Sequence, residues 1–296
     1  MKKDNFKGYL AWLSVCFFWG TTYLAIRIGV SDMPPALFAG FRHLTAGIIF
    51  FSFLMVRGYK PPKVKELWPI AVVGVALLAI ANGLVVSAER WVPSGLTCIL
   101  IATMPFAFVG IEALPPIKKR INIKIGIGLI IGLVGVVLIF LGDLQSLFNP
   151  EYRLGIFEIM LAISAWTLGS LYSKRKNLSV SPLVSASVQM MFAGALLVVF
   201  GYGIGESITF HPGSDSFWAL VYLIFFGSIV GYTSYIYALH HLPASLVATY
   251  SYVNPVIALI LGWLILDEKL DLTIILSSAV ILAGVVMVTR NTKQEH

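Results

Sequence analysis

Aromatic and polar side chains recur within long apolar segments of this chain, and these residue types bind small solutes without changing them chemically. In a bilayer, hydroxyl, indole and amide groups gather where water or a solute reaches. Residues 232–252 contain more tyrosines than would be expected of a segment that only contacts lipid. We therefore predict that a bound solute contacts Trp19, Asn82, Trp166, Tyr232, Tyr235, Tyr252 and Asn254.

Acidic and metal-ligating side chains do not group as catalysis would require. No Asp or Glu lies in the central third of any apolar segment, and Cys16 and Cys98 lack the spacing of metal ligands. A Walker pattern is also missing from the sequence, so direct use of ATP is not expected. We expect no catalytic residue, no metal and no cofactor.

Arg42 lies a third of the way into an apolar segment. An arginine at that depth is costly, so it must face protein or extend to the interface. Gln189 occupies the matching place in the second half of the chain, which favours hydrogen bonding between helices as readily as capture of a carboxylate. We assign Arg42 a structural role and leave carboxylate capture as the alternative.

Two prolines, Pro105 and Pro255, lie near the middle of apolar segments. A proline inside a helix frees a backbone carbonyl and bends the helix, and in lipid that carbonyl must be satisfied by protein or by cavity water. We predict that both residues kink helices and act as gating hinges. The alternative is a static bend that only improves packing.

The composition specifies the elements that must position these residues. The chain has 296 residues, 58% hydrophobic and only 12% charged, with a mean hydropathy of +0.88, whereas soluble chains carry about 25% charged residues. Soluble enzymes, disulfide scaffolds and disordered tails are excluded. Because about 20 apolar residues cross a bilayer, we predict an all-α membrane protein with ten transmembrane helices over residues 9–30, 35–56, 68–88, 92–113, 123–142, 153–173, 182–204, 216–238, 243–266 and 270–289.

The basic residues predict the orientation of these helices. With the N-terminus inside, the inner segments hold 16 Lys and Arg and the outer loops hold 3. Short cytoplasmic loops are enriched in Lys and Arg, so both termini are expected in the cytoplasm. Orientation also explains the net charge of +7. The bilayer is therefore an expected partner and nucleic acid is not.

An internal repeat appears at an offset near 150 residues. Trp19 matches Trp166 and Pro105 matches Pro255. The repeat divides the chain into two five-helix units, residues 9–142 and 153–289. An odd number of helices inverts the second unit relative to the first, and inverted units can alternate the access to a site near the midplane of the membrane.

The pattern resembles the EamA branch of the drug/metabolite transporter superfamily. The resemblance rests on the run from Trp19 to Tyr23, on Phe41-Arg42, on Asn254-Pro255 and on the run from Leu266 to Glu268. It implies a multi-pass protein of a bacterial plasma (inner) membrane that moves small metabolites, often amino acids and commonly outward. It also implies a central cavity lined by the first, third and fourth helices of each half. The acidic pair Asp267-Glu268 has no counterpart in the first half, where Pro116 to Lys118 stand.

The sequence thus predicts a secondary transporter that exports amino acids or related zwitterionic or neutral solutes by alternating access. The missing mid-span carboxylate argues against lipophilic cations, which usually need one. A multidrug or cation efflux carrier remains the alternative, followed by a membrane-embedded enzyme or a channel. Small residues on the fifth and tenth helices, including Gly128, Gly132, Gly135 and Gly284, predict close packing within the monomer or in a homodimer.

Overall fold

The computed structural model describes residues 3–88, 92, 94–115, 117, 120, 122–176, 178–266 and 272–292, which form helices and their connections without a strand. Seven helical stretches in these ranges are long and apolar enough to cross a membrane, and residues 123–139 and 244–260 form shorter apolar helices. The predicted all-helical membrane architecture is confirmed to that extent.

The first half of the chain follows the predicted ranges closely. Prolines begin helices well because their missing N–H is not needed in the first turn, and the second helix begins at Pro35. The elements are α1 (Lys3–Asp32), α2 (Pro35–Val56), α3 (Val64–Gly74), η1 (Val75–Ala81), α4 (Asn82–Ala88), α5 (Ser94–Ile101), α6 (Met104–Ala113) and α7 (Ile123–Ile139), then the short η2 (Leu141–Phe148) and η3 (Pro150–Tyr152).

The second half repeats this order. Pro182 is again the first residue of a helix, and the preceding Ser181 accepts a hydrogen bond from the amide of Leu183 through its side chain. The elements are α8 (Arg153–Arg175), α9 (Pro182–Gly203), α10 (Asp215–Tyr222), η4 (Leu223–Tyr232), α11 (Thr233–His241), α12 (Ala244–Ala248), α13 (Tyr250–Leu266) and α14 (Leu272–Thr292).

Two segments, η1 and η4, are π-helical and interrupt the third long helical stretch of each half. A π-helix has wider turns than an α-helix and is frequent at functional sites. Hydropathy and proline spacing did not predict either segment. The first residues of these segments, Val75 of η1 and Leu223 of η4, lie 148 residues apart, which is close to the repeat offset.

The fourth stretch of each half is broken at an Ala-Thr pair. Thr103 follows α5, Thr249 follows α12, and each side-chain hydroxyl donates to the carbonyl three residues earlier at 2.7 Å. Pro105 is the second residue of α6, so the predicted break lies next to it. Pro255 instead lies inside α13, six residues after Thr249. The break in the second half is therefore displaced from the predicted proline.

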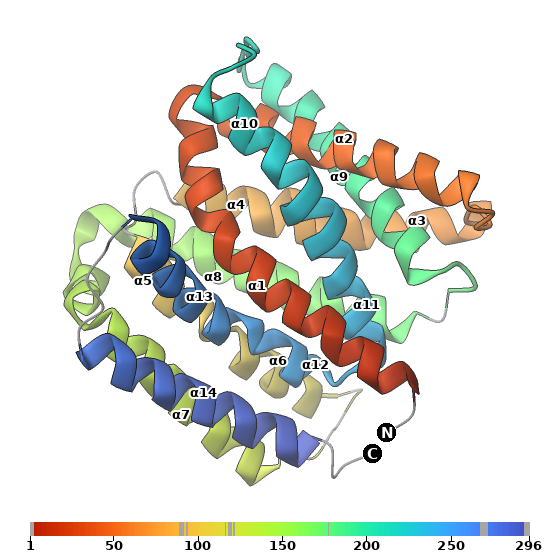
Figure 1. The fold of residues 1–296 in the computed structure, drawn as a ribbon. Helices are drawn as coiled ribbons and strands as arrows, with labels where there is room; N and C mark the ends of the chain where they lie inside the picture. The colour runs from red at the N-terminus through yellow and green to blue at the C-terminus, as the bar shows by residue number, and fades with distance from the viewer. Residues whose placement is uncertain are drawn as a thin grey trace.

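Equivalent helices of the two halves pack together, α2 with α9 and α7 with α14 (Figure 1). At Gly284 a side chain would lie 2.5 Å from the backbone nitrogen of Gly132, so the absence of Cβ atoms permits this approach. The predicted close packing of small residues on α7 and α14 is confirmed within one chain. The start of α1 and the end of α14 lie toward the same end of the molecule in the view of Figure 1.

Candidate functional site

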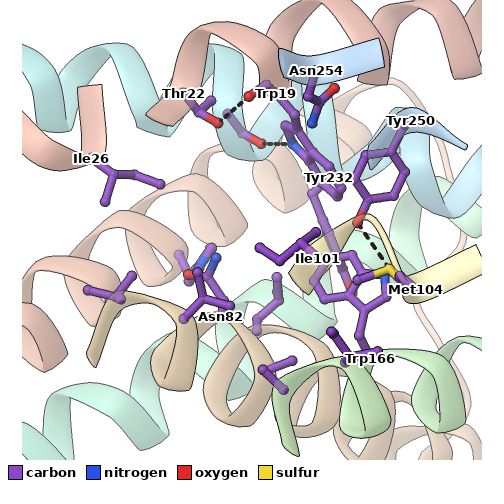
Figure 2. A pocket seen from close by; sticks show the side chains of 18 of the residues that line it. Trp19, Thr22, Ile26, Asn82, Ile101, Met104, Trp166, Tyr232, Tyr250 and Asn254 are labelled. Carbon is purple, nitrogen blue, oxygen red and sulfur yellow. Dashed lines mark hydrogen bonds between the residues drawn. The ribbon is translucent and has the colours of Figure 1, made fainter. Parts of the chain in front are cut away.

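A cavity of about 100 Å³ lies between the two halves, with room for several water molecules. Its walls come from α1, η1 with α4, α5 with α6, α8, η4 and α13, which are the six stretches that the family resemblance implied, and additionally from α2. The lining residues are Trp19, Thr22, Ile26, Arg42, His43, Leu78, Ala81, Asn82, Val85, Val86, Ile101, Met104, Ala162, Ile163, Trp166, Gly227, Tyr232, Tyr250 and Asn254 (Figure 2).

Aromatic rings form one wall of the cavity. Trp19 packs edge-on against Trp166 and Tyr250, with ring centroids 5.5 and 4.9 Å apart. The indole nitrogen of Trp19 donates to the carbonyl oxygen of Gly227 at 3.0 Å (Figure 2). At Gly231, one turn along η4, a Cβ would lie 2.4 Å from that nitrogen. Gly231 of the π-helical segment therefore makes the space in which the Trp19 indole lies.

A polar cluster on α2, α4 and η4 forms another part of the wall. Arg42 donates through Nε to the hydroxyl of Ser228 at 2.9 Å. His43 lies 3.5 Å from the same hydroxyl through Nδ1 and 3.4 Å from Oδ1 of Asn82 through Nε2. Arg42, His43 and Ser228 are each at most 5% exposed. The cluster thus joins α2 of the first half to η4 of the second.

The two broken stretches meet at the cavity through the residues that directly follow the breaks. The hydroxyl of Tyr250 donates to the sulfur of Met104 at 3.6 Å (Figure 2). Met104 begins α6 and Tyr250 begins α13. A contact between the halves therefore joins the two points at which helical hydrogen bonding is interrupted.

Five of the seven predicted solute-contacting residues line the cavity, namely Trp19, Asn82, Trp166, Tyr232 and Asn254. The polar groups of Trp19, Asn82 and Trp166 bond protein, as do those of the other two. The hydroxyl of Tyr232 donates to Gln189 at 2.7 Å. With its side-chain amide turned so that the nitrogen faces acceptors, Asn254 donates at 3.0 Å to the carbonyls of Cys16 and Tyr250. Whether any of the five binds a solute stays a prediction.

The structure does not bring Tyr235 or Tyr252 into the cavity. The Tyr235 hydroxyl accepts from the indole of Trp166 at 2.8 Å and bonds Ser170 at 2.7 Å, so Tyr235 supports the aromatic wall from behind. The Tyr252 hydroxyl donates to the carbonyl of Leu129 on α7 at 3.1 Å. Both tyrosine hydroxyls therefore bond protein groups outside the cavity lining, and their contact with a solute stays a prediction.

Sequence reasoning missed several lining residues, including Thr22, His43, Met104 and Tyr250, and it favoured a structural role for Arg42 over capture of a carboxylate. Tyr250 belongs to the same tyrosine-rich stretch as Tyr252, and residue type alone could not separate them. The adjacent Arg42-His43 pair was recognisable in the sequence as two polar residues within an apolar segment. The side toward which that pair faces depends on the packing of α2 against η4.

Comparisons with known proteins place this architecture among transporters. The model of the EamA-like transporter family matches residues 6–141 and again residues 153–290. The chain is 38% identical over 272 residues to the uncharacterized inner membrane transporter YedA of Escherichia coli K12, covering 92% of this chain and 87% of that one. It is 26% identical over 288 residues to the uncharacterized transporter YoaV of Bacillus subtilis 168, covering 96% and 97%.

A crystal structure of a protein matches over 98% of both chains with a TM-score of 0.80. Its sequence is 21% identical, so this likeness shows the fold alone.

Proposed function

Since the chain belongs to the EamA-like transporter family, and is therefore a multi-span membrane transporter and not an enzyme, we propose that it exports amino acids or related zwitterionic and neutral solutes. The composition of the cavity carries this proposal. Aromatic rings and amides surround one cationic side chain, and the described lining includes no carboxylate. A carrier of lipophilic cations usually needs a buried carboxylate that either the cation or a proton can occupy.

The transport mechanism we propose is alternating access between two inverted five-helix units, residues 9–142 and 153–289. Three correspondences support it: the π-helical segments η1 and η4, the Ala-Thr breaks at Thr103 and Thr249, and the pairing of equivalent helices. Transporters built from inverted repeats exchange the conformations of their halves around a central site. The breaks are the proposed hinges, because interrupted helices bend at lower cost than continuous ones.

The proposed topology has ten membrane-spanning stretches with both termini in the cytoplasm. The excess of Lys and Arg in alternate connections supports this orientation. The proposed outward direction rests on the resemblance to exporters, and the proposal includes assembly as a homodimer.

Uptake by proteoliposomes tests the proposed substrate class. Vesicles containing the full-length protein are offered radiolabelled amino acids and, separately, the lipophilic cation tetraphenylphosphonium, with protein-free vesicles as the control. Saturable movement of at least one amino acid without movement of the cation is expected. Movement of the cation without any amino acid would replace the proposal with cation efflux.

A further inference from the structure

Arg42 is the charged side chain among the described residues that line the cavity. It is 5% exposed, and it donates a hydrogen bond to Ser228 through Nε. A guanidinium has five N–H donors, so the four on its two terminal nitrogens lie beyond that contact. The hydrogen bond that fits the predicted structural role therefore uses only the Nε edge of the guanidinium.

Gly227 makes room for the free end of this guanidinium. A Cβ built at Gly227 would lie 2.7 Å from Nη2 of Arg42 and 3.2 Å from the side chain of Thr22, both of which line the cavity. Nη2 therefore lies directly against the bare backbone of η4. The same residue offers its carbonyl to Trp19. The terminal nitrogens thus lie beside the aromatic wall.

The charge of Arg42 has no acidic partner within the ranges that the structure describes. A buried cation without a counterion is expensive because it loses the solvation of water. A carboxylate is the matching group, since a guanidinium binds it through two parallel N–H donors. By contrast, the described lining offers no acid to hold an ammonium group.

We propose that Arg42 anchors an acidic group of the solute, so that the cavity requires a carboxylate and tolerates an ammonium without requiring it. This inference rests on the proposed transport function and sharpens its substrate class from zwitterions to carboxylates, of which amino acids are one kind. The remainder of the solute lies against Trp19, Trp166 and Tyr250. The Nε contact with Ser228 fixes the plane in which the terminal nitrogens present their donors.

The test compares three probe sets that share side chains. These are phenylalanine, leucine and serine, the corresponding carboxylic acids without the amino group, and the corresponding amines without the carboxyl group. Each competes with the uptake of labelled phenylalanine, leucine or serine into proteoliposomes, and each acid is also tested as labelled substrate. We expect the acids to compete at least as well as the amino acids and the amines to compete at least about tenfold more weakly.

Variants connect the result to Arg42. Arg42→Gln is expected to weaken competition by acids and amino acids at least about tenfold, and Arg42→Lys to restore part of it, because lysine keeps the charge without the paired donors. Arg153→Gln is the matched control, since it removes an exposed arginine at the start of α8. Thermal melting of each purified variant verifies folding. If Arg42→Gln does not fold, the comparison of Arg42→Lys with the control decides.

Failure of the inference is distinguishable from failure of the proposed function. Amino acids transported with amines competing equally, or with Arg42→Lys unchanged from the control, would overturn the role of Arg42 and leave amino-acid transport standing. Transport of the acids without any of the three amino acids would uphold the role of Arg42 and overturn the proposed amino-acid substrates. Transport of none of the probes would overturn both.

Discussion

Two tyrosines on α13 show how function and packing separate at the scale of single residues. Tyr250 lines the cavity, whereas Tyr252 is fully buried against α7 and donates to Leu129. Successive helical residues turn by about 100°, so positions two apart point to different sides. Tyrosine-rich composition located the stretch that forms the site, but it could not assign these two side chains to their sides.

The two hydroxyls can be removed as a matched pair. Tyr252→Phe is expected to lower the free energy of unfolding by about 1 kcal/mol, because a buried hydrogen bond is lost, and to leave the solute concentration for half-maximal uptake unchanged. Tyr250→Phe is expected to raise that concentration, since its hydroxyl belongs to the cavity wall. Thermal melting and uptake titrations measure both effects. A raised concentration for half-maximal uptake in Tyr252→Phe, with no change in Tyr250→Phe, would contradict the placement of the site.

At the scale of elements, starts of helices were predictable where a local rule governs them. Pro35 and Pro182 begin α2 and α9 as expected from the fixed backbone angle of proline. The π-helical η4 was not predictable from hydropathy or proline spacing, and its Gly227 carbonyl accepts from Trp19 of a different helix. The break at Thr249 was not predicted either, because it lies six residues before Pro255, where the Thr249 hydroxyl donates to the carbonyl of Leu246.

The two prolines are expected to differ in effect. Pro105→Ala supplies an N–H that can extend the helix across the break before α6, so it should slow exchange between the two sides of the membrane. Pro255→Ala leaves the break at Thr249 intact and should have the smaller effect. The rate of solute exchange across proteoliposomes, compared with equilibrium binding, measures this. A larger slowing by Pro255→Ala would contradict hinges at the breaks.

Close packing of α7 against α13 and α14 gives a stability prediction. At Gly132 a Cβ would lie 2.6 Å from the Tyr252 ring, whereas at Gly126 on the same helix nothing lies within 4 Å. Gly132→Ala is expected to lower stability by about 1–3 kcal/mol through overpacking. Gly126→Ala should be neutral or stabilising by up to about 1 kcal/mol. Chemical or thermal denaturation of the purified variants checks the difference.

At the scale of the whole molecule, the two halves are tied at opposite ends of α2. Near its start, the hydroxyl of Ser216 on α10 donates to Asp32 at the end of α1 at 2.6 Å. Near its end, Glu66 on α3 accepts from the amide and the hydroxyl of Ser179 at 2.6 and 2.9 Å. Each tie joins the first half to the second, so contacts between the halves lie near both ends of α2.

Loss of each tie is expected to favour opening of the cavity toward the side of the membrane on which that tie lies. Asp32→Ala and Glu66→Ala are introduced with a cavity probe, Ala81→Cys, in a protein whose two native cysteines are replaced by serine. Membrane-impermeant thiol reagents applied from either side should label the probe more rapidly from opposite sides in the two variants. Faster labelling from the same side in both would show that the ties do not control access at opposite ends.

Counterflow tests most directly the central claim that this chain is a carrier with one site reached alternately from two sides. Proteoliposomes are loaded with an unlabelled solute that the protein transports, and uptake of a trace of the same solute in labelled form is followed after dilution. A carrier is predicted to accumulate the label transiently above its external concentration, and Arg42→Gln to weaken this overshoot. Uptake that only equilibrates, with or without trapped solute, would instead indicate a channel and contradict the account.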